Sequence, residues 1–190
     1  MVSLSSEPLA FVTAADLDVW LAGHHAASAE LWVRLWKKGS GIPGVSREEC
    51  IVRALAWGWI DGIGKSFDDL SYVVRLTPRR PRSDWSQRNC AIAERLIAEG
   101  QIQPPGRVQV DAARADGRWA RAYAGSASME MPADLVAALA ARPAAGDAFA
   151  ELNRAQRFAI YLRLQRLRRA ESRARAIRQI LDVLSARQVP

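Results

Sequence analysis

The chain has 190 residues, of which 49% are hydrophobic and 25% charged, and its formal net charge is +7. A chain of this length buries one sizeable core and is short for two, so the sequence predicts a single domain over residues 1–190. No run approaches the roughly 18 consecutive apolar residues that a membrane span needs, and the first residues, MVSLSSEPLAFVTAAD, lack the pattern of a secretory signal. The sequence therefore predicts a cytoplasmic protein without a transmembrane segment.

The N-terminal third is predicted to form two helices with a strand between them. Two capping boxes mark the helix starts, Thr13 with Asp16 and Ser46 with Glu49. Between them, residues 30–37 (ELWVRLWK) are rich in strand formers and apolar on nearly both faces, which predicts a buried strand.

A hairpin is predicted next to this strand. Residues 70–76 alternate in polarity, which is typical of a half-buried strand. Its inward positions are Leu70, Tyr72, Val74 and Leu76. Asp68 and Asp69 are turn formers, and they predict a reversal of the chain from residues 59–67 into this strand.

The rest of the chain has helical spacing. One helix is predicted around residues 92–97 and ends at Gly100, and another lies around residues 110–115. A further helix begins after Pro132 and is stopped by Pro143. The C-terminal segment has apolar residues at spacings of three and four, which form one stripe: Ile160, Leu164, Leu167, Ala170, Ala174, Ile177, Leu181 and Leu184. The sequence leaves open whether this stripe belongs to one long helix or two.

These patterns together predict the α+β class: a mostly helical single domain with a small antiparallel sheet in its N-terminal half and a C-terminal amphipathic, basic helical segment. Residues 154–190 contain ten arginines and only two carboxylates, Glu171 and Asp182, and so carry +8. Such a charge fits a solvated helical face, and it also fits binding of nucleic acid or another polyanion. Both alternatives stay open.

Several kinds of chemistry are disfavoured. Residues 62–66 (GIGKS) resemble the end of a P-loop, but that motif needs a glycine where this chain has Trp59, and a helix after it. Soft metal ligands are few and lack the paired spacings of a zinc site: His24, His25, Cys50 and Cys90. With both histidines adjacent, no catalytic triad is indicated. The sequence predicts no metal and no cofactor.

Asp61 stands alone in an otherwise apolar segment. A carboxylate there needs a partner, because an unpaired buried charge is costly. We expect Lys65, Arg79 or Arg80 to supply that partner, which makes Asp61 a structural residue first and a chemical one second.

The loop before the predicted helix at residues 92–97 combines arginines, a tryptophan and hydroxyl groups. Arg79, Arg80 and Arg82, with Trp85 and a helix start at Ser83 or Ser86, have the chemistry to hold a phosphate or a carboxylate. The alternative is that the arginines pair with acids and stack on tryptophans, and so lock the loop in place. The sequence does not separate the two.

Four stretches carry a family resemblance: ALAWGWIDG, RLTPRRPRSDWSQRN, AERLIAEGQIQPPGRVQVDAARADGRWARAY and RRAESRARAIRQIL. They resemble the YdeI/OmpD-associated family, also called bacteriocin-protection proteins, in the right order from about residue 11 to residue 185. The resemblance implies a bacterial protein with a role in stress or envelope protection and in tolerance of bacteriocins and cationic peptides. It implies no established reaction.

The favoured function is a binding module for a protein partner or a small anionic ligand. Its candidate binding residues are Asp61, Lys65, Arg79, Arg80, Ser83, Trp85, Ser86, Asn89, Arg118, Trp119 and Tyr123. One alternative is nucleic-acid binding through the basic C-terminal helices, although no helix-turn-helix, RRM or zinc-finger pattern supports it. The other is an uncharacterised enzyme, with Tyr123 as a proton donor. The site of that enzyme would combine Asp61, Lys65, Arg80 and Ser86.

Overall fold

The structure is a computed structural model that describes residues 4–186. The chain divides into two compact units, Met1–Ala122 and Tyr123–Pro190. The buried clusters of the described residues also fall within one unit or the other. The single domain stays a prediction, because the compactness of two units does not test whether they unfold together.

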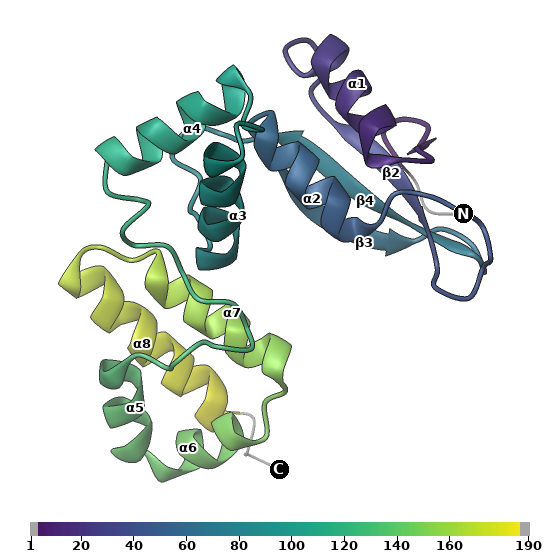
Figure 1. The fold of residues 1–190 in the computed structure, drawn as a ribbon. Helices are drawn as coiled ribbons and strands as arrows, with labels where there is room; N and C mark the ends of the chain where they lie inside the picture. Colours follow the sequence, from purple (N-terminus) through teal and green to yellow (C-terminus); the bar gives the residue numbers. More distant parts are fainter. Residues whose placement is uncertain (1–3, 187–190) are drawn as a thin grey trace. The chain divides into compact units, whose positions relative to one another are not determined.

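The first unit contains a four-stranded mixed sheet with the strand order β1-β2-β4-β3 (Figure 1). β1 (Leu9–Ala10) pairs parallel with β2 (Leu31–Trp36), and β2 pairs antiparallel with β4 (Ser71–Pro78). β3 (Trp59–Ser66) completes a hairpin with β4. The α+β class, the buried strand and the hairpin are thus confirmed, and the short β1 makes the sheet mixed.

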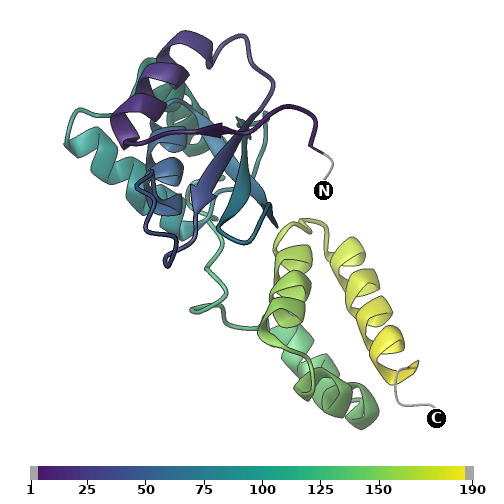
Figure 2. The same ribbon diagram turned by 90° about the vertical axis from the view of Figure 1, so that its right-hand side faces the viewer.

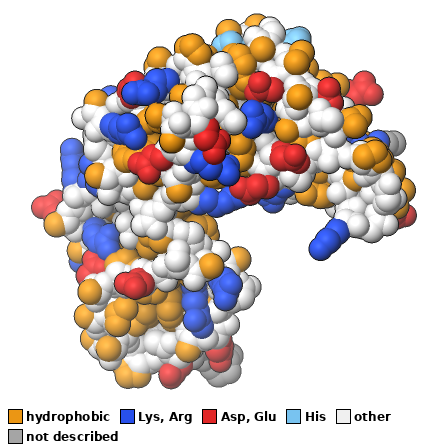
Figure 3. All heavy atoms as spheres, in the orientation of Figure 1, with side chains coloured by type: hydrophobic (Ala, Val, Ile, Leu, Met, Phe, Trp, Pro, Cys, Tyr) orange, Lys and Arg blue, Asp and Glu red, His pale blue; other side chains and the backbone are white. Residues whose placement is uncertain are grey.

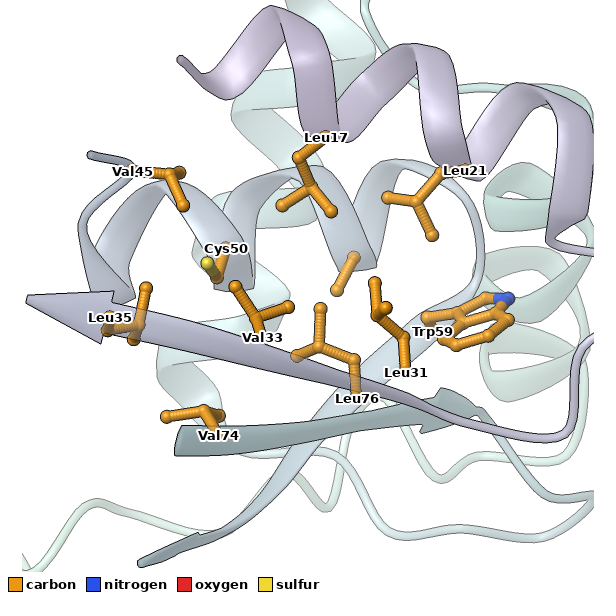
Figure 4. Packing of buried hydrophobic residues seen from close by; sticks show 11 residues of the cluster. Leu17, Leu21, Leu31, Val33, Leu35, Val45, Cys50, Trp59, Val74 and Leu76 are labelled. Atoms are coloured by element: carbon orange, nitrogen blue, oxygen red, sulfur yellow. The ribbon is translucent and has the colours of Figure 1, made fainter. Parts of the chain in front are cut away.

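Helices α1 (Ala14–His24) and α2 (Arg47–Ala56) cover one face of this sheet (Figure 4). Each begins in the predicted capping box, in which the cap hydroxyl and the carboxylate three residues on both accept backbone N–H groups. Capping satisfies amides that have no partner inside the helix, and one cap contributes about 1 kcal/mol.

The first core lies between these two helices and the sheet. Leu17 and Leu21 of α1 and Cys50 of α2 are fully buried there. They pack against inward-facing strand residues, which are Leu31, Val33, Leu35, Trp59, Val74 and Leu76 (Figure 4). Burying one such aliphatic side chain stabilises the fold by roughly 1.5–3 kcal/mol.

The opposite face of the sheet is more buried than the alternation of residues 70–76 predicts. Ser71 and Val73 lie on it, and both are fully buried. Arg34 Nε donates to Ser71 Oγ at 3.0 Å, and its guanidinium lies 4.4 Å from the centre of the Trp36 ring. Leu70, predicted to face inward, lies outside β4 and is 50% exposed. The prediction of a half-buried strand is therefore wrong, because long side chains cover the second face.

Helices α3 (Gln87–Ala98) and α4 (Pro104–Ala115) complete the first unit, as predicted. With α2 they enclose a second core, which includes Ile51, Leu55, Trp85, Ile92, Leu96 and Val110. Gly106 of α4 comes so close to the end of α2 that a Cβ on it would lie 2.2 Å from the carbonyl oxygen of Ala56. Only glycine allows this approach.

Every regular element that the structure describes in the second unit is a helix. α5 (Ala133–Ala140), α6 (Pro143–Ala150), α7 (Arg154–Gln165) and α8 (Ala170–Ala186) enclose a core of their own. Pro143 ends the predicted helix but also begins α6, which the sequence analysis did not predict. Proline is tolerated at a first helical position, where its missing N–H has no partner in any case.

The C-terminal amphipathic segment forms two helices, α7 and α8, separated at residues 166–169. The two helices lie side by side in both views (Figures 1 and 2). Leu164 and Leu184 of the predicted stripe are buried. Ile177 and Leu181 of the stripe are buried as well, whereas Ala170 and Ala174 are exposed. The stripe is therefore confirmed for its leucines and Ile177, and it is wrong for these two alanines near the start of α8.

Candidate functional site

Arg79, directly after β4, stabilises the loop that leads into α3. Its side chain is inside the protein, since the residue is only 4% exposed. Its guanidinium donates to the carbonyl oxygen of Asp84 at 2.9 Å and lies 3.8 Å from the centre of the Trp85 ring. Its backbone N–H donates to the carbonyl oxygen of Gly58 at 3.0 Å. A desolvated cation over an indole contributes about 2 kcal/mol.

Arg118 also stabilises this loop, through a different carbonyl oxygen. It is 8% exposed, and its Nη1 donates to the carbonyl oxygen of Ser83 at 2.9 Å. Its Nε donates to the carboxylate of Asp116, and this hydrogen bond holds the pKa of Asp116 below its usual value. The neighbouring Trp119 packs on Trp85, with ring centroids 4.9 Å apart. We call Arg79, Ser83, Trp85, Arg118 and Trp119 the arginine–tryptophan lock.

α3 begins beside this lock. Ser86 is its N-cap, as one of the two predicted starts, and accepts the backbone N–H of Asn89 at 3.1 Å. Asn89 itself is buried, at 7% exposure. The indole N–H of Trp85 is also buried and has no hydrogen-bond acceptor among the described residues. Both packing and hydrogen bonds therefore stabilise the arginine–tryptophan lock.

The contacts favour the locking alternative for Arg79 and Arg118. Arg80 differs from both, because it is exposed and its side chain makes no polar contact with any residue in the range 4–186. Arg82 is also exposed and has a positive φ of 65°, which is uncommon outside glycine. Anion binding by Arg80 stays a prediction.

Asp61 and Lys65 lie on β3 and have partners other than those expected. Asp61 pairs with Arg47 at the start of α2, with 3.2 Å between Oδ2 and Nη2. The expectation that Lys65, Arg79 or Arg80 is its partner is wrong, because the strand turns Asp61 toward the face that α2 covers. The Lys65 ammonium lies 5.4 Å from the centre of the Trp32 ring.

Tyr123 belongs to the second unit, whereas the other candidate residues belong to the first. Its ring lies near that of Phe158, with the two centroids 6.4 Å apart. The Phe158 ring in turn stacks near Tyr161, whose hydroxyl accepts the backbone N–H of Ala124 at 3.0 Å. Tyr123 as a proton donor stays a prediction.

The thiols and imidazoles have structural environments. Burial raises the pKa of the Cys50 thiol to about 12 and that of Cys90 to about 11, so neither is a reactive thiolate at neutral pH. Nδ1 of His24 and of His25 lies within hydrogen-bond distance of a helix carbonyl oxygen. Among residues 4–186, no group of three His, Cys, Asp or Glu could hold a metal ion.

A groove between α7 and α8 is the larger of the two described cavities, at about 600 Å³. Most of its lining is apolar: Leu152, Ala159, Ile160, Ile180, Val183 and Leu184. Gln156, Arg163, Gln179 and Asp182 add polar groups. The sequence analysis missed this α7–α8 groove, although Val183 and Ala159, which lie off the predicted stripe, are apolar positions with no place in the core.

A second cavity, of about 410 Å³, lies in the first unit between the end of β2 and the start of α2. Its charged lining residues are all basic: Lys37, Lys38 and Arg47. Trp36, Ser40, Ile42 and Tyr72 also line it. We call it the loop pocket. No sequence pattern connected the two lysines with Arg47.

The fold and its cavities define a two-unit α+β protein with a helical second unit that carries an open groove. Residues 9–109 match a family model described as a domain of unknown function, DUF8412, and residues 128–187 match a second one, described as bacteriocin-protection, YdeI or OmpD-associated. The chain thus belongs to the DUF8412 family and carries a YdeI/OmpD-associated domain at its C-terminal end.

The resemblance to the YdeI/OmpD-associated family is thereby confirmed for the second unit. The GWIDG and TPRR motifs lie in the segment that matches DUF8412. No curated protein and no solved structure matches the chain. None of the helices in residues 4–186 combines the length and the apolar character needed to span a bilayer.

Proposed function

We propose that the protein is a binding module rather than an enzyme, and that its α7–α8 groove holds an amphipathic helix of a partner protein. The observation that carries the proposal is the apolar floor of this groove, about 600 Å³ in volume, with polar groups beside it. Binding sites are typically concave and mostly apolar, with a few polar groups that orient the ligand. Val183, in the groove, is 59% exposed.

The dimensions of the groove suit a helix. On α7 the lining residues run from Gln156 to Arg163, a stretch of eight residues that spans about 10 Å along the axis. Two turns of a partner helix cover this length and present apolar anchors at positions i, i+3 or i+4, and i+7. At one point along the groove, Arg163 Nη2 donates to Gln179 Oε1 at 2.5 Å and so joins α7 to α8.

The charge around the groove selects the partner. Residues three or four positions from a lining residue share its side of a helix, so exposed arginines flank the groove on both helices. These arginines are Arg163, Arg166, Arg175 and Arg178. The carboxylate in the lining, Asp182, is paired with Arg142 at 2.6 Å. The complementary partner has an apolar face bordered by Asp and Glu.

The same charge bears on the biological role. A basic surface repels a cationic peptide, so direct capture of such a peptide by the groove is electrostatically unfavourable. We place the protein in the bacterial cytoplasm, in stress or envelope protection, where it acts on bacteriocin and cationic-peptide tolerance through an acidic protein partner. This role rests on the family description and on the charge of α7 and α8.

The test uses a designed 18-residue helical peptide with leucines on one face and glutamates on the rest, labelled with fluorescein. Fluorescence anisotropy is expected to show saturable binding by the wild type, and Val183→Glu is expected to weaken it by at least about tenfold, which corresponds to 1.4 kcal/mol. Val136→Glu is the matched control, because Val136 is a similarly exposed valine of the same unit, at 51%, outside the groove lining.

A peptide with lysine in place of glutamate separates the contributions of charge and apolar surface, and is expected to bind less well. Equal binding of both peptides, or equal loss in Val183→Glu and Val136→Glu, contradicts the proposal. A single-stranded oligonucleotide tests the nucleic-acid alternative, which requires affinity that falls steeply with salt. If the oligonucleotide binds equally well to the wild type and to Val183→Glu, and neither peptide binds, the function is polyanion binding and the proposal of a helix-binding groove is wrong.

A further inference from the structure

The loop pocket of the first unit carries an inference that does not depend on the α7–α8 groove. Three cationic side chains line it, Lys37, Lys38 and Arg47, and its lining contains no carboxylate. At about 410 Å³ it is larger than a phosphate or a carboxylate group needs, and it lies within the range of small-molecule sites. We propose that the loop pocket binds a small organic phosphate or carboxylate.

The three cationic side chains differ in the partners that hold them at the pocket. Lys37 Nζ donates to the carbonyl oxygens of Asp68 and Asp69, at 2.9 and 3.1 Å, and these neutral acceptors fix its position without removing its charge. Lys38 is exposed, and its side chain makes no polar contact with any residue from 4 to 186. Lys38 is therefore available to an incoming anion.

Arg47 is held at the pocket by β3. Its guanidinium pairs with Asp61 and remains 48% exposed. Where β3 carries an irregularity between Asp61 and Gly64, a Cβ on Gly64 would come within 3.9 Å of Arg47 Nη1. One guanidinium edge faces Asp61, and a guanidinium has donors to spare for a second, bidentate partner. Asp61 thereby acts as a positioning residue.

The remaining lining residues suit the organic part of such a ligand. Trp36 and Ile42 supply apolar surface, and Ile42 is 40% exposed. Gly44 allows the Trp36 ring to lie against the loop, because a Cβ on Gly44 would be 2.6 Å from Trp36 Cδ1. The hydroxyl of Tyr72 makes no hydrogen bond to a described residue and is a donor for the ligand.

At the start of α2, two backbone amides already have partners, because the capping box of Ser46 and Glu49 satisfies the N–H groups of these two residues. The carboxylate of Glu49 accepts both the backbone N–H and the hydroxyl of Ser46. The proposal rests on the cationic lining and on the size of the cavity.

The test is calorimetric titration of the full chain with phenyl phosphate, inorganic phosphate, benzoate and phenol, each at 20 and 150 mM salt. Phenyl phosphate or benzoate is expected to bind at least about tenfold more tightly than inorganic phosphate and than phenol, because each combines an anion with an apolar ring. The comparison of phenyl phosphate with benzoate identifies which anionic group the pocket prefers.

Two variants locate the binding. Lys38→Ala and Arg47→Gln are each expected to weaken it at least fivefold, and Lys38→Ala changes an exposed loop residue that the fold does not need. Arg95→Ala removes an exposed cation of the same unit outside the pocket lining and is expected to leave the affinity unchanged. No saturable binding, or binding that both pocket variants retain, overturns the proposal. So does equal binding of phenyl phosphate and inorganic phosphate, because the apolar wall then contributes nothing.

Discussion

The arginine–tryptophan lock of the first unit and the basic helices of the second unit use arginine in opposite ways. In the lock, Arg79 and Arg118 are buried, and their guanidinium groups donate to backbone carbonyl oxygens. On α7 and α8, Arg163, Arg175 and Arg178 are exposed. Buried arginines therefore accompany the dense motifs of the first unit, and exposed arginines accompany the repetitive sequence of the second. The rare residues of the first unit maintain its fold, and the repetitive ones of the second face its surroundings.

The largest effect is expected from removing the centre of the lock. Trp85→Ala should destabilise the first unit by about 3–5 kcal/mol, because a large indole that is 2% exposed leaves a cavity and Arg79 loses its stacking partner. Urea unfolding followed by circular dichroism measures this. Trp85→Phe is the control and should cost much less, since it keeps an aromatic ring and removes an indole N–H without an acceptor. Equal losses in both variants would show that the ring itself is not the anchor.

A smaller loss is expected for Arg118→Ala. This variant leaves the partly buried carbonyl oxygen of Ser83 without its donor, which should cost at most about 1–3 kcal/mol, the penalty for a fully buried acceptor without a partner. Arg118→Lys should recover little, because an ammonium cannot donate to Ser83 and Asp116 with the geometry of a guanidinium. Thermal unfolding of the three proteins provides the comparison. Full recovery by lysine would mean that charge alone matters at this position.

The second unit should respond to pH through Asp134. Arg173 donates to both carboxylate oxygens of Asp134, from Nε at 2.5 Å and from Nη2 at 2.9 Å. These hydrogen bonds hold the pKa of Asp134 below its ordinary value of 3.8. A depressed pKa in the folded state stabilises the fold above pH 3.8, and this contribution disappears as the pH falls through the folded-state value. The melting temperature of Asp134→Asn should therefore fall less than that of the wild type between pH 5 and about 2. Parallel curves for the two proteins would contradict the pairing.

The smallest effect is expected for Arg80→Ala. Arg80 is exposed and makes no polar side-chain contact within residues 4–186, so its removal should change the free energy of unfolding by less than about 0.5 kcal/mol. Neighbouring Arg79→Ala, in contrast, should cost several times more. Urea unfolding of the two adjacent variants measures the contrast between an exposed and a locked arginine. Similar losses would place Arg80 in the lock as well.

Local patterns predicted much of the fold. The capping boxes at Thr13 and Ser46 depend only on residues three positions apart, and both are present. α6 was missed because Pro143 is equally suited to ending one helix and to beginning the next. The burial of Val73 was missed because it depends on what covers the second face of the sheet, which alternation within one strand does not encode.

The site was harder to predict than the fold. The sequence analysis paired Asp61 with Lys65 or with the loop arginines that follow it, whereas the structure pairs Asp61 with Arg47, fourteen residues earlier. The pairing with Arg47 depends on how α2 packs on β3, which no local pattern encodes. The α7–α8 groove arises only when two helices pack, so no single helix carries its pattern. Only the excess of arginines in residues 154–190 indicated that this part of the chain has an exposed, basic surface.

The central claim is that binding takes place on α7 and α8 and leaves the arginine–tryptophan lock unchanged. Hydrogen exchange followed by mass spectrometry, with and without the leucine–glutamate peptide, tests it most directly. The account predicts slower exchange in peptides that cover residues 156–184 and no change in those that cover residues 79–89. Slower exchange confined to residues 79–89, with residues 156–184 unchanged, would contradict it and return the binding site to the loop before α3.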